Sequence, residues 1–147
     1  MCRLSTILRS ISEPPKCDCA TCRGMCERIP CWPTQEEAVA LISAGLGPKL
    51  MVAETPGGIA LLCPATPGSE GRSIAWPHPW SQATLPCVFY GPGGCSLHDR
   101  GLKPIEGRYA HCRVDVPDDL HEAIAESWDT KGRRLVSMWI RRFGAKE

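Results

Sequence analysis

Five of the ten cysteines lie in one short stretch, between Cys17 and Cys31. So short a stretch has no core of its own to fill, and packing therefore does not explain this density of sulfur. The Cys19-x-x-Cys22 spacing lets one tight turn aim two sulfurs at a single point, at the usual zinc–sulfur distance of about 2.3 Å. Gly24 gives that turn the backbone freedom it needs. The stretch predicts a thiolate metal site.

Disulfides and unligated thiols are the alternatives to metal. The density of ten cysteines in 147 residues approaches that of disulfide scaffolds. However, residues 1–10 are interrupted by Arg9 and lack the unbroken apolar stretch and cleavage site of an export signal. No segment approaches 18 apolar residues, so we expect no membrane span. We therefore expect a cytoplasmic protein, in which closely spaced cysteines usually serve metal or redox chemistry.

The composition predicts a small core and much irregular backbone. The chain has 14 glycines and 14 prolines, but only two phenylalanines and two tyrosines. Small cores are often reinforced by a metal or by disulfides. The length suggests one domain over residues 1–147. We expect an α+β fold that is small, irregular, cysteine-rich and metal-stabilised, with short strands and a C-terminal helical segment.

Apolar spacing and turn residues place the first elements. Residues 4–11 have the spacing of a short amphipathic helix. Thr34 and Glu37 form a capping box that should open a helix of about eleven residues. Short strands are expected at 50–52 and 59–63, and residues 64–86 read as an irregular loop.

A second group of cysteines surrounds a glycine-rich turn. Residues 91–94 read Gly-Pro-Gly-Gly, which indicates a hairpin loop between two short strands. Cys87 and Cys95 flank this hairpin, so we expect them to lie near each other.

The C-terminal segment, residues 115–143, should be helical, with a break at Gly132. Residues 115–129 carry six acids and no Lys or Arg, whereas residues 131–147 carry six bases and one acid. Acids early and bases late complement a helix macrodipole. The 17 basic and 16 acidic side chains of the whole chain nearly balance. The sequence therefore does not favour nucleic acid as a partner, and it identifies no other partner.

These motifs resemble a mostly uncharacterised family of zinc- or iron-chelating proteins named for a Cys-x-x-Cys-x-x-Cys-Cys motif. Cys19-x-x-Cys22-x-x-Met25-Cys26 is similar to that motif, with methionine at the third cysteine. Thr34-Gln-Glu-Glu37 is similar to the helix start that follows it. Cys87-Val-Phe-Tyr and Gly94-Cys95-Ser-Leu-His98 are similar to the second block of the family.

The resemblance covers residues 17–112, which we expect to be the metal-binding core. Lys103-Pro104 stands where the family has Arg-Pro, three residues later than expected. Gly107 occupies the position of the final cysteine, and Cys112 follows later. Cys17 and Cys31 are the candidates to replace what is missing.

The resemblance implies a cofactor that is either an iron–sulfur cluster or zinc, since both accept four thiolates. The expected metal ligands are cysteines of the two blocks: first Cys19, Cys22, Cys26 and Cys95, and in competition with them Cys17, Cys31 and Cys87. Cys63 and Cys112 are further candidates, and Cys2 is expected to be a free thiol.

Three functions fit these expectations, and no catalytic residue is identified. The first is an iron–sulfur protein with a redox role. The second is a structural zinc module that mediates protein or nucleic-acid contacts. The third is a metal-storage protein. Broad absorption near 400 nm, stoichiometric zinc, or variable loading with soft metals would distinguish them.

Overall fold

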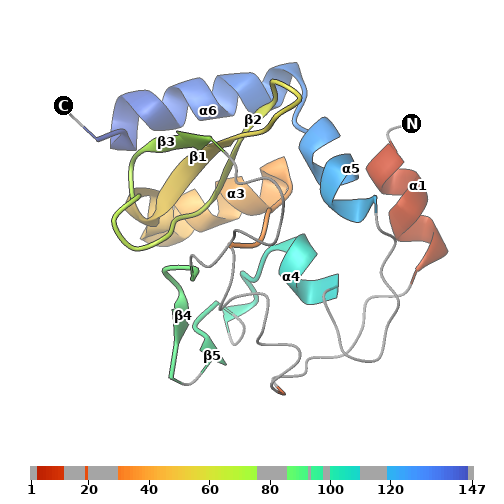
Figure 1. Ribbon diagram of the computed structural model, residues 1–147, viewed down its shortest axis with the longest axis horizontal. Helices are drawn as coiled ribbons and strands as arrows, with labels where there is room; N and C mark the ends of the chain where they lie inside the picture. Colours follow the sequence, from red (N-terminus) through yellow and green to blue (C-terminus); the bar gives the residue numbers. More distant parts are fainter. Residues whose placement is uncertain are drawn as a thin grey trace.

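The computed structural model describes residues 3–11, 19, 30–75, 86–92, 94–97, 100–109 and 119–145. The described helices and helical turns are α1 (Arg3–Ser10), α3 (Gln35–Leu41), η1 (Ile42–Leu46), η2 (Gly47–Lys49), α4 (Ile105–Tyr109), α5 (Leu120–Glu126) and α6 (Thr130–Phe143). The described strands are β1 (Leu50–Glu54), β2 (Ala60–Pro64), β3 (Ser73–Ala75), β4 (Tyr90–Gly91) and β5 (Gly94–Cys95). These elements confirm the expected α+β class (Figure 1).

Strand β1 is the centre of a three-stranded sheet of order β2-β1-β3. It pairs antiparallel with β2, from Leu50 opposite Pro64 to Glu54 opposite Ala60, and parallel with β3. The first four residues of β1 are buried, because the sheet lies in the middle of the core. The two expected strands are confirmed. The sequence missed β3, whose three half-buried or exposed residues have no apolar pattern.

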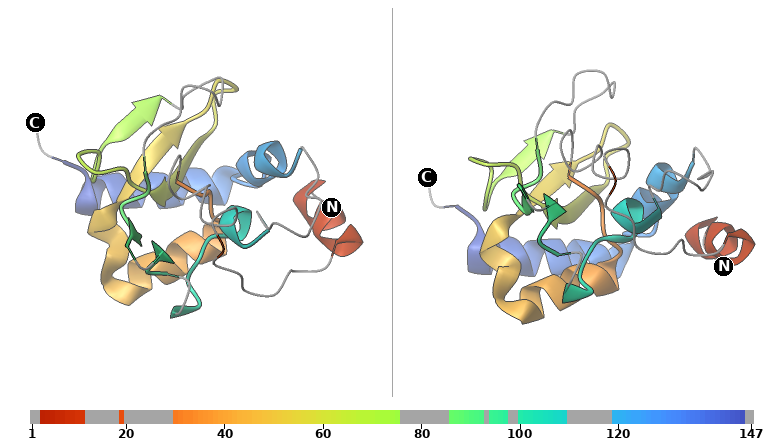
Figure 2. Two further views of the ribbon diagram at one scale, coloured as in Figure 1. Left: turned by 60° about the horizontal axis from the view of Figure 1, so that its bottom comes forward. Right: turned by 90° about the horizontal axis from the view of Figure 1, so that it is seen from below.

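Helices α3 and α6 lie on the same side of this sheet (Figure 2). The capping box is confirmed: Glu37 N–H donates to Thr34 Oγ1, and the Glu37 carboxylate accepts from Thr34 N–H. The wider turn η1 continues α3, and Gly45 has a φ of 84°, which favours glycine. The indole N–H of Trp139 on α6 donates to Gly47 O at 2.9 Å, which ties α6 to η2, the turn that follows η1.

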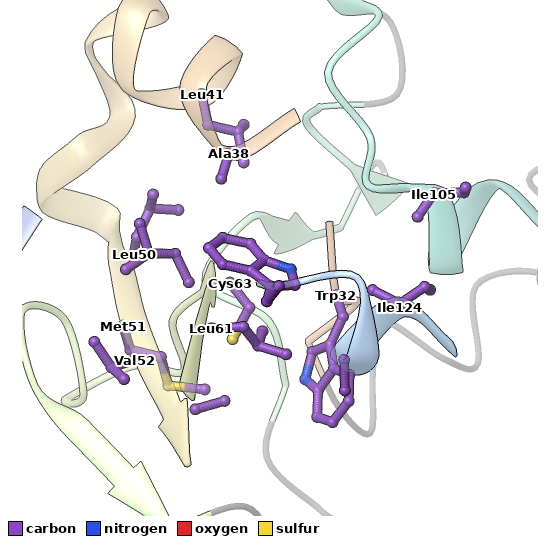
Figure 3. Close-up of a cluster of buried hydrophobic side chains, with 14 of the residues drawn as sticks. Trp32, Ala38, Leu41, Leu50, Met51, Val52, Leu61, Cys63, Ile105 and Ile124 are labelled. Atoms are coloured by element: carbon purple, nitrogen blue, oxygen red, sulfur yellow. The ribbon is translucent and has the colours of Figure 1, made fainter. Parts of the chain in front are cut away.

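One apolar cluster contains side chains from the described elements between α1 and α6. Figure 3 shows side chains of this core from β1, β2, α3, α4 and α5. It includes Trp32, which lies outside the helices and strands, and Cys63 of β2. The core is therefore larger than the low content of Phe and Tyr suggested, because Leu, Ile, Ala and Trp fill it.

The glycine-rich hairpin is also confirmed. Strands β4 and β5 pair antiparallel, with Tyr90 opposite Cys95 and Gly91 opposite Gly94. The Val88 N–H donates to Ala65 O at 2.7 Å, so the residues before the hairpin are tied to the end of β2.

The C-terminal helical segment breaks earlier than expected. The break lies at residues 127–129, between α5 and α6, and Gly132 is inside α6. The Asp129 side chain accepts from the N–H groups of Lys131 and Gly132 and so starts the new helix. Close packing favours glycine at position 132, because a Cβ there would lie 3.0 Å from Cε3 of Trp128.

The acids of α5 have a partner that the sequence did not indicate. Arg3 of α1 forms ion pairs with Asp119, Glu122 and Glu126, which joins the first helix to α5. These pairs are exposed, so each contributes at most about 1 kcal/mol. Among the described residues, no helix combines the length and the apolar character that crossing a membrane requires.

Candidate functional site around helix α4

The described cysteines differ strongly in exposure. Cys19 is exposed, Cys95 is half-buried, and Cys31, Cys63 and Cys87 are buried. No disulfide joins any two of these five cysteines. The other expected ligands, Cys17, Cys22 and Cys26, lie outside the described residues, as do Cys2 and Cys112.

Cys31 and Gly107 are in close contact, although they are far apart in the sequence. A Cβ atom at position 107 would lie 2.7 Å from the sulfur of Cys31 and 2.9 Å from Cε of Lys103. Real Cβ atoms do not approach other heavy atoms so closely, so the Cys31 sulfur and the Lys103 chain fill the space that a side chain at 107 would need. Cys31 itself is only 3 % exposed.

A buried carboxylate binds the residue next to Cys31. Glu106, which is 5 % exposed, accepts from the Trp32 backbone N–H at 3.1 Å through Oε1. The Glu106 backbone N–H donates in return to Trp32 O at 3.4 Å. Through Oε2, Glu106 contacts Nδ1 of His121 on α5. The His121 ring also stacks on Trp32, with ring centroids 3.5 Å apart. Together these contacts fix the residues beside Cys31 between α4 and α5.

A second carboxylate holds the start of α4. Glu37, besides capping α3, accepts from the Ile105 backbone N–H at 3.0 Å and pairs with Nη2 of Arg108 at 2.7 Å. Burial raises the pKa of Glu37, and the hydrogen bonds from Thr34 and Ile105 partly oppose that rise. Burial likewise lowers the pKa of Arg108. Glu37 therefore joins two helix starts with one side chain.

Cys63 and Cys87 belong to the apolar side of the same region. Burial raises the pKa of the wholly buried Cys63 thiol well above its ordinary value. Cys87 and Glu106 raise it further, because their negative charge would repel a Cys63 thiolate. In the metal-free chain Cys63 therefore behaves as a small apolar core residue.

The geometry only partly follows the expected ligand set. Cys95 lies opposite Tyr90 in the hairpin, and Cys87 precedes that pair by a turn in which Tyr90 N–H donates to Cys87 O. Within the described ranges, no three His, Cys, Asp or Glu side chains are arranged to hold a metal ion. Three of the seven expected ligands are outside those ranges.

Sequence reasoning missed Glu106 and His121. Helix α4 has only five residues, too few for an apolar period to reveal it. The burial of an acid cannot be read from its type, because most acids are exposed. One sequence signal was usable: Gly107 stands where the resembling family has a cysteine. The structure brings the sulfur of Cys31 against this position.

No family model, curated protein or solved structure matches the chain. The chemistry of the site must therefore be inferred from its own residues.

Proposed function

We propose that this protein binds metal through cysteine thiolates, as an iron–sulfur protein with a redox role or as a zinc protein. The observation that carries the proposal is the contact between Cys31 and Gly107. Cys31 ends the first cysteine block, and Gly107 is the position at which the second block of the resembling family ends. Cys31 thus lies against that position, and in the proposed centre it supplies the sulfur that the family has at 107.

The residues present suit such a centre in part. The buried sulfur of Cys31 lies close to the side chain of a lysine, Lys103, and a nearby cation favours thiolate over thiol. Cys63 suits it poorly, because burial and two acidic neighbours oppose its ionisation. We therefore propose ligands from Cys17, Cys19, Cys22, Cys26, Cys31, Cys87 and Cys95, and leave Cys63 out. When bound, an iron–sulfur cluster would supply one-electron redox chemistry, whereas zinc would supply a structural cross-link.

The test is metal per chain after anaerobic purification. We expect iron and sulfide with broad absorption near 400 nm, or else a colourless protein with stoichiometric zinc. Cys19→Ser, Cys22→Ser and Cys31→Ser should each lose metal. Cys63→Ala is the matched control, because it removes a buried sulfur outside the proposed ligand set and should keep full loading. Full loading in all of the serine variants would refute the proposal.

A structural zinc module is the alternative, and the surface of α6 favours it. Arg133, Arg134, Arg141 and Arg142 are exposed on this helix. The acids of α5 that could neutralise them are paired with Arg3 instead. If this surface binds nucleic acid through phosphates, affinity must fall steeply with salt. Binding that is absent at physiological salt would exclude nucleic acid as the partner of this surface. Either form of the proposal suits a reducing compartment such as the cytoplasm.

A further inference from the structure

Val39 of α3 and Ile140 of α6 are the two exposed large apolar side chains of the described part of the chain. Val39 is 47 % exposed and Ile140 is 45 % exposed. Single apolar residues on a surface are common and need no explanation, whereas apolar residues that lie together indicate a contact surface. The packing of their two helices decides which case applies here.

Contacts at both ends hold α3 and α6 side by side, on the same side of the sheet (Figure 2). At the start of α3, Cδ of Gln35 lies 3.3 Å from the point at which a Cβ of Gly132 would stand. At the far end, after η1, the indole of Trp139 donates to Gly47 O at 2.9 Å. Early residues therefore meet early residues and late residues meet late ones, so the helical segment 35–49 runs alongside α6 in the same direction. We call the boundary between them the α3–α6 seam.

Helical spacing places both exposed apolar side chains at this seam. On α3, Val39 follows Gln35 by four residues, so the two lie on one face of the helix. On α6, Gly132, Val136 and Ile140 are also spaced by four and form one row. This row faces α3, because Gly132 contacts Gln35 and Val136 is buried. Val39 and Ile140 therefore border the same seam, about one helical turn, or 5–6 Å, apart along it.

A row of positive charge runs beside the seam. Arg133, Ser137 and Arg141 are again spaced by four, and all three are exposed. Helix α6 contains no Asp or Glu. Among the described residues, neither arginine of this row forms an ion pair, and the exposed Glu36 of α3 does not reach them. The seam is therefore an apolar strip with a positive border that the described residues do not neutralise.

We propose that the α3–α6 seam is a docking surface for an acidic amphipathic helix of a partner protein. Such a helix places apolar residues, spaced by three, four and seven, along an apolar strip. Its apolar residues contact Val39 and Ile140, and carboxylates on its flank pair with Arg133 and Arg141. The inference goes beyond metal binding and does not depend on it.

Charge and chemistry favour this occupant over two others. A nucleic acid would contact the arginines through its phosphates and leave the two apolar side chains without a partner. A second copy of this chain, related by a two-fold axis, would present the same surface and so bring arginines against arginines. An acidic helix matches both the apolar strip and its positive border.

The experiment measures how the full chain binds a fluorescent helical peptide about as long as α6, by anisotropy at physiological salt. The probe peptide has leucine along one face and glutamate elsewhere. A second peptide has glutamine in place of leucine, and a third has lysine in place of glutamate. The variants of the chain are Ile140→Ala and Arg141→Gln, with Ile140→Leu and Arg141→Lys as conservative partners. Arg9→Gln, at an exposed arginine of α1, is the matched control for loss of charge. The new residues are good helix formers at exposed positions, so the fold should be kept.

Wild type should bind the leucine–glutamate peptide saturably, with a Kd below about 1 mM, and should bind neither of the other two peptides. Ile140→Ala and Arg141→Gln should each weaken binding by about 5- to 10-fold. The conservative variants and Arg9→Gln should stay close to wild type.

Four results would overturn the inference. The first is no saturable binding of the leucine–glutamate peptide. The second is equal binding of the glutamine peptide, which would show only a general attraction between opposite charges. The third is tighter binding of a DNA duplex that Arg141→Gln weakens, which would make the seam a nucleic-acid surface. The fourth is a dimer of the chain that Ile140→Ala dissociates, which would identify a second copy as the occupant.

Discussion

Replacing Gly107 with alanine tests the contact at the centre of the candidate site. Gly107 lies inside α4, where alanine would normally stabilise a helix by up to about 1 kcal/mol. Here the new Cβ would lie 2.7 Å from the Cys31 sulfur and 2.9 Å from Cε of Lys103. The lysine chain can shift, but the buried sulfur is held by its neighbour Trp32, which Glu106 binds at the backbone.

The magnitude follows from these two opposing effects. Forcing one extra carbon into a packed interior costs about 1–3 kcal/mol. A helix of five residues recovers only part of the propensity gain, so the net destabilisation should be about 1–2 kcal/mol. For a chain of this size, that corresponds to a fall of roughly 3–6 °C in melting temperature.

The assay is thermal and urea unfolding of the metal-free chain, with Gly91→Ala as control. A Cβ at Gly91 would have no heavy atom within 4 Å, so alanine there tests the loss of glycine without a close contact. We expect Gly107→Ala to melt well below wild type and Gly91→Ala to stay within about 0.5 kcal/mol of it. A Gly107→Ala chain as stable as wild type would show that Cys31 does not fill this space.

Three further predictions concern neighbouring residues. The double variant Cys31→Ala/Gly107→Cys moves the sulfur from one side of the contact to the other, so it should keep the metal that Cys31→Ala alone loses. The measurement is metal per chain. If the double variant loses as much metal as Cys31→Ala, position 107 does not share a metal site with position 31. The pKa of the Cys63 thiol is higher in the folded chain than in the unfolded chain, where it is about 8.5. The neutral thiol therefore contributes its full stability below about pH 8.5, and this contribution is lost as the pH rises toward the folded pKa. The free energy of unfolding of metal-free wild type should therefore fall above about pH 8.5 more steeply than that of Cys63→Ala, and parallel curves would contradict the assignment. Glu37→Ala should cost about 2 kcal/mol, because it leaves the amide groups at two helix starts without an acceptor, whereas exposed Glu36→Ala should cost under about 0.5 kcal/mol in the same urea titration.

Local patterns predicted the elements whose causes are local. The capping box of Thr34 and Glu37 gave the start of α3, because both of its hydrogen bonds join residues of one turn. The Gly91–Gly94 turn gave the hairpin for the same reason. The early helix followed from the apolar spacing of Leu4 and Ile7, both of which are buried.

Long-range contacts determine what could not be predicted. Glu37 was seen as a cap, but its bond to the Ile105 amide joins residues 68 positions apart, and no periodicity encodes such a partner. The break between α5 and α6 was placed at Gly132, because glycine is a poor helix former. The structure puts the break at 127–129 and uses the missing side chain of Gly132 to admit Trp128. A glycine inside a helix can therefore mark close packing rather than an end.

The candidate site was only partly predictable for the same reason. Cys31 and Gly107 were both singled out by spacing, yet their contact depends on the tertiary fold. The metal ligands themselves remain a prediction, since Cys17, Cys22 and Cys26 lie outside the described residues. The burial of Lys103 could not be inferred from a residue type that is nearly always exposed.

The hydrogen bond between Trp32 and Glu106 also limits when, during synthesis, the surroundings of Cys31 can form. The two residues are 74 positions apart, and a ribosome adds about 5–20 residues per second, so Glu106 is made roughly 4–15 s after Trp32. Throughout that interval the first cysteine block is already synthesised, while the segment that fixes Cys31 does not yet exist. A metal centre that includes Cys31 can therefore reach its final surroundings only after α4 has been made. Until then, the newly made cysteines depend on the reducing power of their surroundings.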